Sequence, residues 1–372
     1  MRIGPYEVIA PLRSGGMASL VLARRIGARG FARLVAIKRV HEHLSDDPAM
    51  IRRFVDEARL SSAIAHPAVV RVEDLVEHEG ELHLVMEHVH GVTLGRVMDR
   101  LRARDRRMKP EVAVAIAAWI AEGLEAAHQA HDAEGRWLGL VHRDVSPSNV
   151  LIASSGHVKL IDFGIASARV REHESTMGHV LGKLRYAAPE QLRRDPLDAR
   201  ADVYALGVLL WEMLTCEALF SGGHDALASG RPAIDPPSRH APEVSEALDA
   251  VVREALAEDP RQRIASARAL RDALRASTPE CAAIGAPEIA AMLEALVGED
   301  LARASQELPM EARTSPGAVS TKALDRTTVS RTAPAPIVRA KKKARAGTPW
   351  ATYAIVIAGL IVGVIAGALL AR

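Results

Sequence analysis

Three side chains with hard oxygen donors lie in two short segments of the sequence. Asp144 and Asn149 belong to VHRDVSPSNVL at residues 141–151, and Asp162 belongs to LIDFG at residues 160–164. Carboxylate and amide oxygens suit Mg²⁺, which proteins bind chiefly through carboxylates and substrate phosphates. These residue types are therefore suitable ligands for a magnesium ion.

A lysine ends the apolar segment VAIK at residues 35–38, whose β-branched residues predict a strand. An ammonium group buried among apolar side chains without a partner is costly, so Lys38 needs an acidic partner. The alternative is a surface lysine whose stem lies along apolar neighbours while its charged end reaches water.

Two adjacent glycines, Gly15 and Gly16, lie in LRSGGMASL at residues 12–20. Glycine permits backbone conformations that bring N–H groups close to a phosphate. A tight turn between two strands would use the same glycines, so this segment by itself leaves both interpretations open.

The composition excludes several other classes of protein. The 372 residues include 48 Lys and Arg and 46 Asp and Glu, which gives a formal net charge of +2. No overall positive charge therefore indicates nucleic acid as the partner. Cys216 and Cys281 lie far apart, so neither a disulfide framework nor a zinc site is expected. The N-terminal residues contain no continuous apolar stretch, which argues against a secretory signal peptide.

The elements that must position these residues change along the chain. Short β-branched runs at residues 34–40, 69–76 and 82–89 predict strands, and apolar residues spaced near one helical turn predict a helix over residues 50–65. Beyond residue 91 the pattern is mostly helical. The predicted helical segments lie at residues 94–105, 111–130, 201–215, 245–257 and 266–276.

In this order, the motifs resemble those of the bacterial eukaryotic-like serine/threonine protein kinases. The resemblance covers about residues 6–275 and implies an α+β, bilobal protein kinase fold. An N-lobe of one antiparallel sheet and one helix would take residues 6–90, and a mainly helical C-lobe would take residues 91–275. The resemblance also implies ATP, Mg²⁺ and protein substrates with Ser or Thr hydroxyls.

The resemblance gives each motif a role. Asp144 would orient the acceptor hydroxyl and accept its proton, while Asn149 and Asp162 would bind Mg²⁺. Glu57 would pair with Lys38, which would hold the α- and β-phosphates. The residues implied to contact the nucleotide are Leu12, Gly15, Gly16, Leu20, Ala36, Lys38, Glu87, Val89 and Leu151.

Further residues resemble the scaffold of the family. Residues 165–190 resemble an activation segment that ends in AAPE, in which Glu190 would pair with Arg263. Asp202 resembles the buried aspartate that braces the catalytic loop. His142 is expected to be structural rather than a base.

Arg143, beside the catalytic position, suggests control by phosphorylation of the activation segment, because a new phosphate can satisfy an arginine. Ser175 and Thr176 are the candidate acceptors. Exposed serine and threonine in such a loop are usually just solvated, so this remains a hypothesis.

Three positions depart from the family pattern. Ser146 replaces the lysine that meets the γ-phosphate, and Arg13 and Ala18 replace the first and third glycines of the glycine-rich loop. We hypothesise that Lys183, near the end of the activation segment, supplies the missing charge. Full phosphotransfer by a Lys183→Ala variant would exclude that hypothesis.

The C-terminal part changes character twice. Residues 276–308 keep helical spacing and predict an extension that packs on the larger lobe. Residues 309–349 are rich in Ser, Thr, Pro, Ala and basic residues without an apolar period, which predicts a disordered linker. Its serines and threonines could be autophosphorylated, or the linker could be a passive spacer.

Residues 350–371 are apolar or small and uncharged, long enough as a helix for a bilayer core of roughly 30 Å. The alternative is a buried helix. Basic residues at 339–345 predict that the segment preceding the span is cytoplasmic, which gives a single-pass protein of the cell membrane. Gly359, Gly363 and Gly367 share one helix face and could form a homodimer contact.

Three functions fit this organisation. The first is an active protein kinase that phosphorylates proteins, itself included. The second is a pseudokinase that binds nucleotide without turnover and acts as a membrane-tethered scaffold. The third, a small-molecule phosphotransferase on the same scaffold, fits less well with a peptide-docking activation segment.

Overall fold

The computed structural model describes residues 1–14, 18–27, 31–41, 47–163, 184–220 and 233–307. These residues all belong to the first of two units into which the chain divides, Met1–Val319. Gly15, Gly16, Lys183, Ser175, Thr176, the linker at 309–349 and the predicted span at 350–371 lie outside the described residues.

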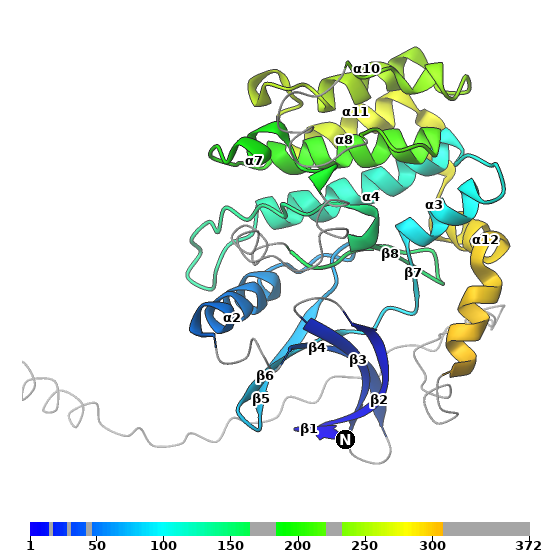
Figure 1. The fold of residues 1–372 in the computed structure, drawn as a ribbon. Coiled ribbons are helices and arrows are strands. Elements are labelled where there is room, and N and C mark those ends of the chain that lie inside the picture. The colour runs from blue at the N-terminus through cyan, green and yellow to red at the C-terminus, as the bar shows by residue number, and fades with distance from the viewer. Residues whose placement is uncertain (15–17, 28–30, 42–46, 164–183, 221–232, 308–372) are drawn as a thin grey trace, which may run out of the picture. The chain divides into compact units, whose positions relative to one another are not determined.

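Six antiparallel strands form the N-terminal sheet (Figure 1), in the order β1-β2-β3-β4-β6-β5. The bounds are β1 Arg2–Ile3, β2 Tyr6–Ser14, β3 Ala18–Ile26, β4 Ala32–Val40, β5 Val72–His78 and β6 Glu81–Glu87. Apolar side chains of one face, among them Tyr6, Val35 and Ile37, form a small core. The sheet therefore holds Lys38 at a fixed register, opposite Leu20 on β3 and Leu84 on β6.

The helix α2, Pro48–Ser62, packs against this sheet through Phe54 and Ala58, which contact Leu84. Its start is fixed by Asp47, whose side chain accepts a hydrogen bond from the Ala49 amide at 2.8 Å, and by Pro48 in the first turn. The single helix predicted over residues 50–65 is confirmed. Its packing brings Glu57 to the inner face of the sheet.

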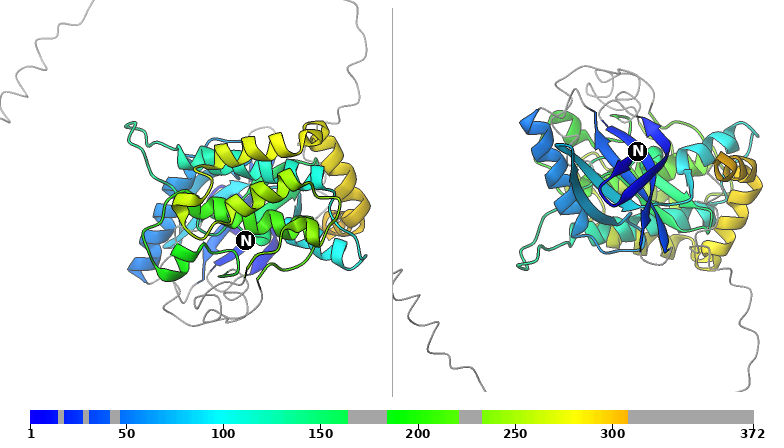
Figure 2. Two further views of the ribbon diagram at one scale, coloured as in Figure 1. Left: turned by 90° about the horizontal axis from the view of Figure 1, so that it is seen from above. Right: turned by 90° about the horizontal axis from the view of Figure 1, so that it is seen from below.

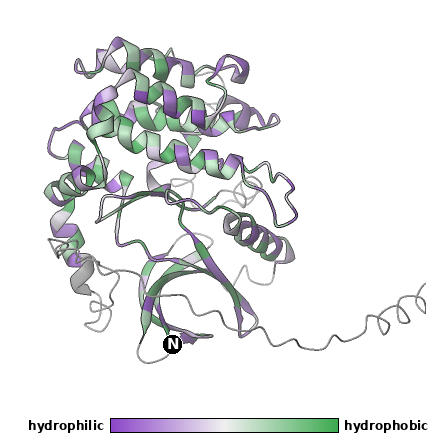
Figure 3. Cartoon of the chain, turned by 180° about the vertical axis from the view of Figure 1, so that it is seen from behind, coloured by the Kyte–Doolittle hydropathy of each residue, from purple (hydrophilic) through white to green (hydrophobic). Residues whose placement is uncertain are grey.

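The C-terminal region is mainly helical, as predicted, and its longest buried elements are α4, Pro110–His128, and α8, Arg200–Thr215. Both are hydrophobic nearly all round, which is the pattern of a helix surrounded by protein. Figure 3 shows apolar residues concentrated along these stacked helices. The surrounding helices are α3 Leu94–Arg102, α7 Pro189–Arg193, α10 Glu246–Ala255 and α11 Ala267–Ser277, with short 3₁₀ turns η2 Pro147–Asn149, η3 Pro237–Arg239 and η4 Pro260–Gln262.

A second, three-stranded sheet was not predicted. It consists of β7 Gly91–Thr93, β8 Val150–Ala153 and β9 Val158–Leu160, paired antiparallel in that order. Strands of three or four residues are too short to show a reliable alternation of apolar and polar side chains. This sheet carries Leu151 and joins the connection after β6 to the segments that contain Asn149 and Asp162.

The predicted helical extension is present as η5 Pro279–Ala283 and α12 Ala286–Glu307. Ile289, Leu293 and Leu296 are buried in the main hydrophobic core, so the extension packs on the larger lobe as expected. Figures 1 and 2 show α12 beside α3. Within the part of the chain that the structure describes, no helix combines the length and apolar character needed to cross a membrane.

Candidate active site

The side chain of Lys38 links the two lobes. Its Nζ atom donates to Glu57 Oε1 at 2.6 Å and to Asp162 Oδ1 at 3.0 Å. Lys38 lies on β4, Glu57 on α2, and Asp162 follows β9. The acidic partner expected for a lysine in an apolar strand is therefore present. The structure brings Lys38, Glu57 and Asp162, three of the predicted site residues, into direct contact.

The electrostatics of this cluster follow from its burial. Burial acts to lower the pKa of Lys38, but the carboxylates of Asp162 and Glu57 outweigh it and raise that pKa above its ordinary value. Burial raises the pKa of the Glu57 carboxyl, and the Lys38 ammonium opposes that rise. The lysine therefore stays charged throughout the physiological range.

Asp144 and Asn149 form the second part of the site. The Asn149 side-chain amide donates to Asp144 Oδ2 at 2.8 Å and to the Asp144 carbonyl at 2.9 Å. This arrangement assigns the amide nitrogen to Asp144, so the side-chain oxygen of Asn149 is directed to the remaining space. The Ile161 amide donates to the Asn149 carbonyl at 3.0 Å, which places Asp162 next to this loop.

The loop around Asp144 is braced from beneath by Asp202, which is fully buried at the start of α8. Its carboxylate accepts from the amides of His142 at 2.7 Å and Arg143 at 2.8 Å. Its Oδ2 atom also lies 2.8 Å from His128 Nε2. Although burial acts to raise the pKa of Asp202, the hydrogen bonds and charge of the histidines lower it below its usual value.

His128 is a partner that sequence reasoning missed. It lies in the last turn of α4 and is buried, but a single histidine in an apolar helix carries no signal of its partner. Only the fold reveals that it meets Asp202 from another helix.

Backbone conformation at Arg143 and Asp162 is left-handed, with φ of 64° and 55°. Non-glycine residues adopt this region at a cost, and such residues concentrate at functional sites. Phe163, next to Asp162, is buried against the His142 ring with centroids 4.6 Å apart and in an apolar cluster that includes Ile64. This packing fixes the residue that directly follows Asp162.

Ser146 is buried, with only 2% of its surface exposed, and its hydroxyl lies 3.1 Å from the Ser148 hydroxyl. The backbone carbonyl of Ser146 accepts a hydrogen bond from the backbone amide of Asn149 at 2.9 Å. A short neutral side chain thus occupies the position where the resemblance implies a lysine. The ammonium of Lys38 contacts the carboxylates of Glu57 and Asp162.

The predicted nucleotide-contacting residues lie on both sides of the connection between the lobes. Ala36 is on β4, where it is paired with Leu22 and Met86, and Leu151 is on β8. Leu12 is 41% exposed on β2, and Leu20 lies opposite Lys38.

Glu87 and Val89 belong to the connection between the lobes. The Glu87 amide donates to the Arg71 carbonyl at 2.9 Å, and its carboxylate accepts from Lys159 Nζ at 2.6 Å. The amide and side chain of Glu87 are thus committed to protein partners, so a nucleotide would have to use its carbonyl. The role of these residues in nucleotide binding stays a prediction.

The expected pair of Glu190 and Arg263 is present and buried. Arg263 donates through Nη1 to Glu190 Oε1 at 2.7 Å and through Nη2 to Oε2 at 3.1 Å. Such a two-point pair fixes the orientation of both side chains. It ties α7, at the end of the predicted activation segment, to the loop before α11.

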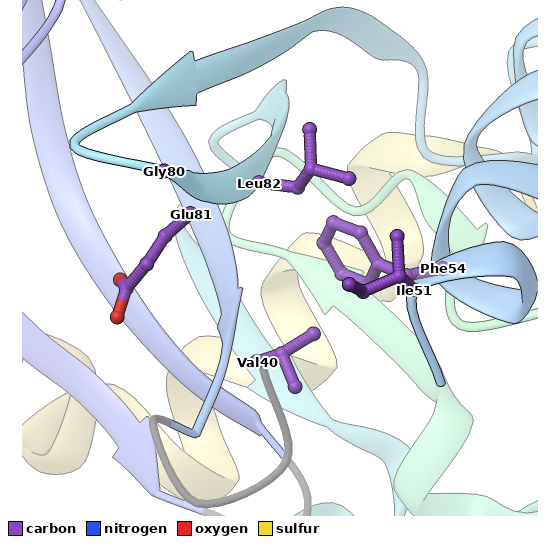
Figure 4. Close-up of a pocket in the computed structure, with 6 residues that line it drawn as sticks. All are labelled: Val40, Ile51, Phe54, Gly80, Glu81 and Leu82. Atoms are coloured by element: carbon purple, nitrogen blue, oxygen red, sulfur yellow. The ribbon is translucent and has the colours of Figure 1, made fainter. Parts of the chain in front are cut away.

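An apolar hollow between α2 and the β5–β6 hairpin is shown in Figure 4. It is lined by Val40, Ile51, Phe54, Gly80, Glu81 and Leu82, and the Glu81 side chain points away from the apolar groups. None of the predicted site residues lines it, so it is distinct from the cluster around Lys38.

The family model for the protein kinase domain matches residues 6–274. The chain belongs to the protein kinase family. This kinase is 39% identical over 304 residues to the tyrosine-protein kinase MasK of Myxococcus xanthus, an alignment that covers 80% of this chain and 47% of MasK. It is 37% identical over 275 residues to the serine/threonine-protein kinase PknB of Mycobacterium tuberculosis, covering 72% of this chain and 42% of PknB.

Solved structures agree with the bilobal fold of the kinase. The Mycobacterium tuberculosis PknI kinase domain matches with a TM-score of 0.57 at 26% identity, covering 74% of this chain and 98% of the PknI domain. The kinase spans less than half the length of the curated relatives MasK and PknB. Their names alone therefore do not fix its acceptor or its partners.

Proposed function

We propose that this chain is an ATP-dependent serine/threonine protein kinase that phosphorylates proteins, itself included. The observation that carries the proposal is the double contact of Lys38 with Glu57 and Asp162. Protein kinases need both the lysine–glutamate pair and the metal-binding aspartate in place, because catalysis rests on positioning and charge stabilisation.

The residues present fit a magnesium–nucleotide complex. Asp162 and the side-chain oxygen of Asn149 would hold Mg²⁺, which supplies neutralisation of the phosphate charge when bound. Among the described residues, no group of three or more His, Cys, Asp or Glu side chains could hold a metal ion by itself. A donor set of one carboxylate and one amide suits a metal that also takes phosphate oxygens.

Asp144 would orient the acceptor hydroxyl and take its proton. Its side chain is itself oriented by the Asn149 amide, and its backbone by Asp202 through the amides of His142 and Arg143. A base held from two directions can present one oxygen to the acceptor.

Serine and threonine are the proposed acceptors, because relatives over most of this chain, PknB among them, bear the name serine/threonine-protein kinase. MasK, named a tyrosine-protein kinase, makes tyrosine the competing outcome. Acid hydrolysis of a protein substrate phosphorylated by the full chain will separate the two. Phosphoserine and phosphothreonine are expected, and phosphotyrosine alone would overturn the assignment.

Ser146 favours a second candidate, a pseudokinase that holds nucleotide and acts as a binding module. Transfer of phosphate to a generic basic protein, measured for the wild type and for Asp162→Asn, separates the candidates. An active kinase loses transfer in the variant, whereas equal background values for both proteins would favour the binding module.

We also propose that residues 350–371 anchor the kinase in the cell membrane with its catalytic region cytoplasmic. Support comes from the apolar character of the segment and the basic residues at 339–345. Extraction of cell membranes at alkaline pH tests the proposal. The full chain should remain in the pellet and a chain ending at residue 349 should not.

A further inference from the structure

The helix α12 lies beyond the region that the protein kinase model matches, which ends at residue 274. It is nevertheless built into the larger lobe. Leu293, Val297 and Leu301 are buried in its main hydrophobic core. The helix α12 therefore lies outside the family domain but forms part of the hydrophobic core of the larger lobe.

The C-terminal half of α12 is held to α3 by Asp300, whose side chain is only 13% exposed. Asp300 accepts from Arg100 Nη2 at 2.7 Å and from Arg96 Nε at 3.1 Å. Arg104 adds a hydrogen bond to the Ala295 carbonyl at 2.9 Å. Arg100 and Arg96 hold the pKa of Asp300 at about 2, so the carboxylate is charged in the whole physiological range.

The first turn of α12 rests on the tight turn between β8 and β9. Gly156 has a φ of 84°, and a Cβ atom there would lie 1.8 Å from the Ala286 carbonyl oxygen. Only glycine permits this approach of two backbones. The α12 backbone is therefore seated directly on the hairpin whose first strand carries Leu151.

The two elements that α12 contacts, α3 and the β8–β9 turn, both adjoin the predicted active site. The helix α3 packs on the catalytic loop, since a Cβ atom on Gly95 would lie 3.5 Å from Pro147 Cβ, and Pro147 begins the turn that ends at Asn149. The β8–β9 turn is tied to the connection between the lobes by the Ser154 amide, which donates to the His90 carbonyl at 2.8 Å. Between these supports, β7 pairs with β8, with Thr93 opposite Leu151.

We propose that α12 is a brace for the nucleotide site and that Asp300 is its positioning residue. By holding α3 and the β8–β9 turn together, it fixes Asn149 relative to Leu151, the two points on which a magnesium–nucleotide complex would rest. The expected effect on ATP binding rests on the proposed function. The coupling of α12 to α3 and the β8–β9 turn does not.

Hydrogen exchange of the full chain without nucleotide tests the coupling. In Asp300→Asn, amides of residues 145–153 should exchange several-fold faster than in the wild type, although the side-chain hydrogen bonds of Asp300 are with Arg96 and Arg100 on α3. Glu294→Gln, on the exposed face of the same helix, is the matched control and should leave these amides unchanged. Asp300→Glu keeps the charge and should restore most of the protection.

The effect on nucleotide is measured separately, as the KM for ATP at saturating magnesium. Asp300→Asn should raise KM about threefold to tenfold with a smaller change in kcat, as expected for a residue coupled to a site it does not touch. The proposal that α12 is a brace would be overturned if faster exchange were confined to α12 and α3. It would also be overturned if Asp300→Asn and Glu294→Gln had equal KM values for ATP. A wild type that transfers no phosphate would overturn the proposed function, and the exchange result would still decide the coupling.

Discussion

Lys38 and Glu57 form an ion pair of 2.6 Å between the central strand of the N-terminal sheet and its only described helix. Both side chains are shielded from solvent, with 19% and 7% of their surfaces exposed. An ion pair in this setting orients the ammonium toward Asp162, rather than adding stability on the surface. The position of α2 therefore controls the site.

Replacing Glu57 by Gln should lower kcat/KM for phosphotransfer by roughly tenfold to a hundredfold, because the ammonium loses the group that orients it. Asp56→Asn on the exposed side of the same helix is the control and should behave as the wild type. Steady-state kinetics with a protein substrate will measure both. Equal rates for the two variants would contradict a functional role of the pair.

Arg263→Ala should destabilise the chain by about 3–5 kcal/mol, since Glu190 would be left as a buried charge without its guanidinium. The Arg263 and Glu190 side chains are 0% and 5% exposed. Arg261→Ala removes a neighbouring arginine that is 85% exposed, and should leave the stability nearly unchanged because exposed ion pairs contribute little. Urea denaturation of both variants checks the difference, which a similar cost in each would refute.

Gly156→Ala and Gly80→Ala separate backbone strain from the contact with α12. Their φ angles are nearly equal, 84° and 83°, but among the described residues nothing lies within 4 Å of a Cβ atom on Gly80. Gly80→Ala should cost about 1–2 kcal/mol for the left-handed conformation alone. Gly156→Ala must also displace the first turn of α12 and should cost at least about 2 kcal/mol more. Thermal unfolding will show whether this difference exists.

His88 should make stability depend on pH. Burial, with a contribution from the nearby His90, lowers the pKa of His88 to about 4 in the folded chain. The unfolded chain takes up this proton first, near its ordinary pKa of about 6.5, so stability present above that value is lost as the pH falls toward the folded value.

Between about pH 7.5 and about pH 5 the loss due to His88 should be about 1–2 kcal/mol. His88→Gln should remove it, while His157→Gln, which changes an exposed histidine, should not. Urea denaturation at both pH values measures the difference. An unchanged pH dependence in His88→Gln would show that another group is responsible.

The sequence predicted those parts of the site whose residues are close along the chain or belong to an ordered set of motifs. The need of Lys38 for an acidic partner followed from its place in an apolar strand, and the resemblance named Glu57 as that partner. The pair of Glu190 and Arg263 followed from the resemblance. These predictions are confirmed as contacts, whereas the catalytic and binding roles of the residues stay predictions.

Other features could not be read from the sequence because their partners come together only in the fold. His128 gives no sign of its contact with Asp202, and Asp300 gives none of its contacts with Arg96 and Arg100. The strand pairing of β7 with β8 joins short segments separated by two helices, and short strands carry little periodic signal.

Lys38, Asn149 and Asp162 are proposed to hold one magnesium–nucleotide complex. Equilibrium binding of ATP to the full chain, with Mg²⁺ and then with a chelator in excess, tests it most directly. We expect saturable binding that weakens at least about tenfold without Mg²⁺, and a similar loss of affinity in Asp162→Asn. Binding equally tight with and without Mg²⁺, or no binding at all, would contradict it.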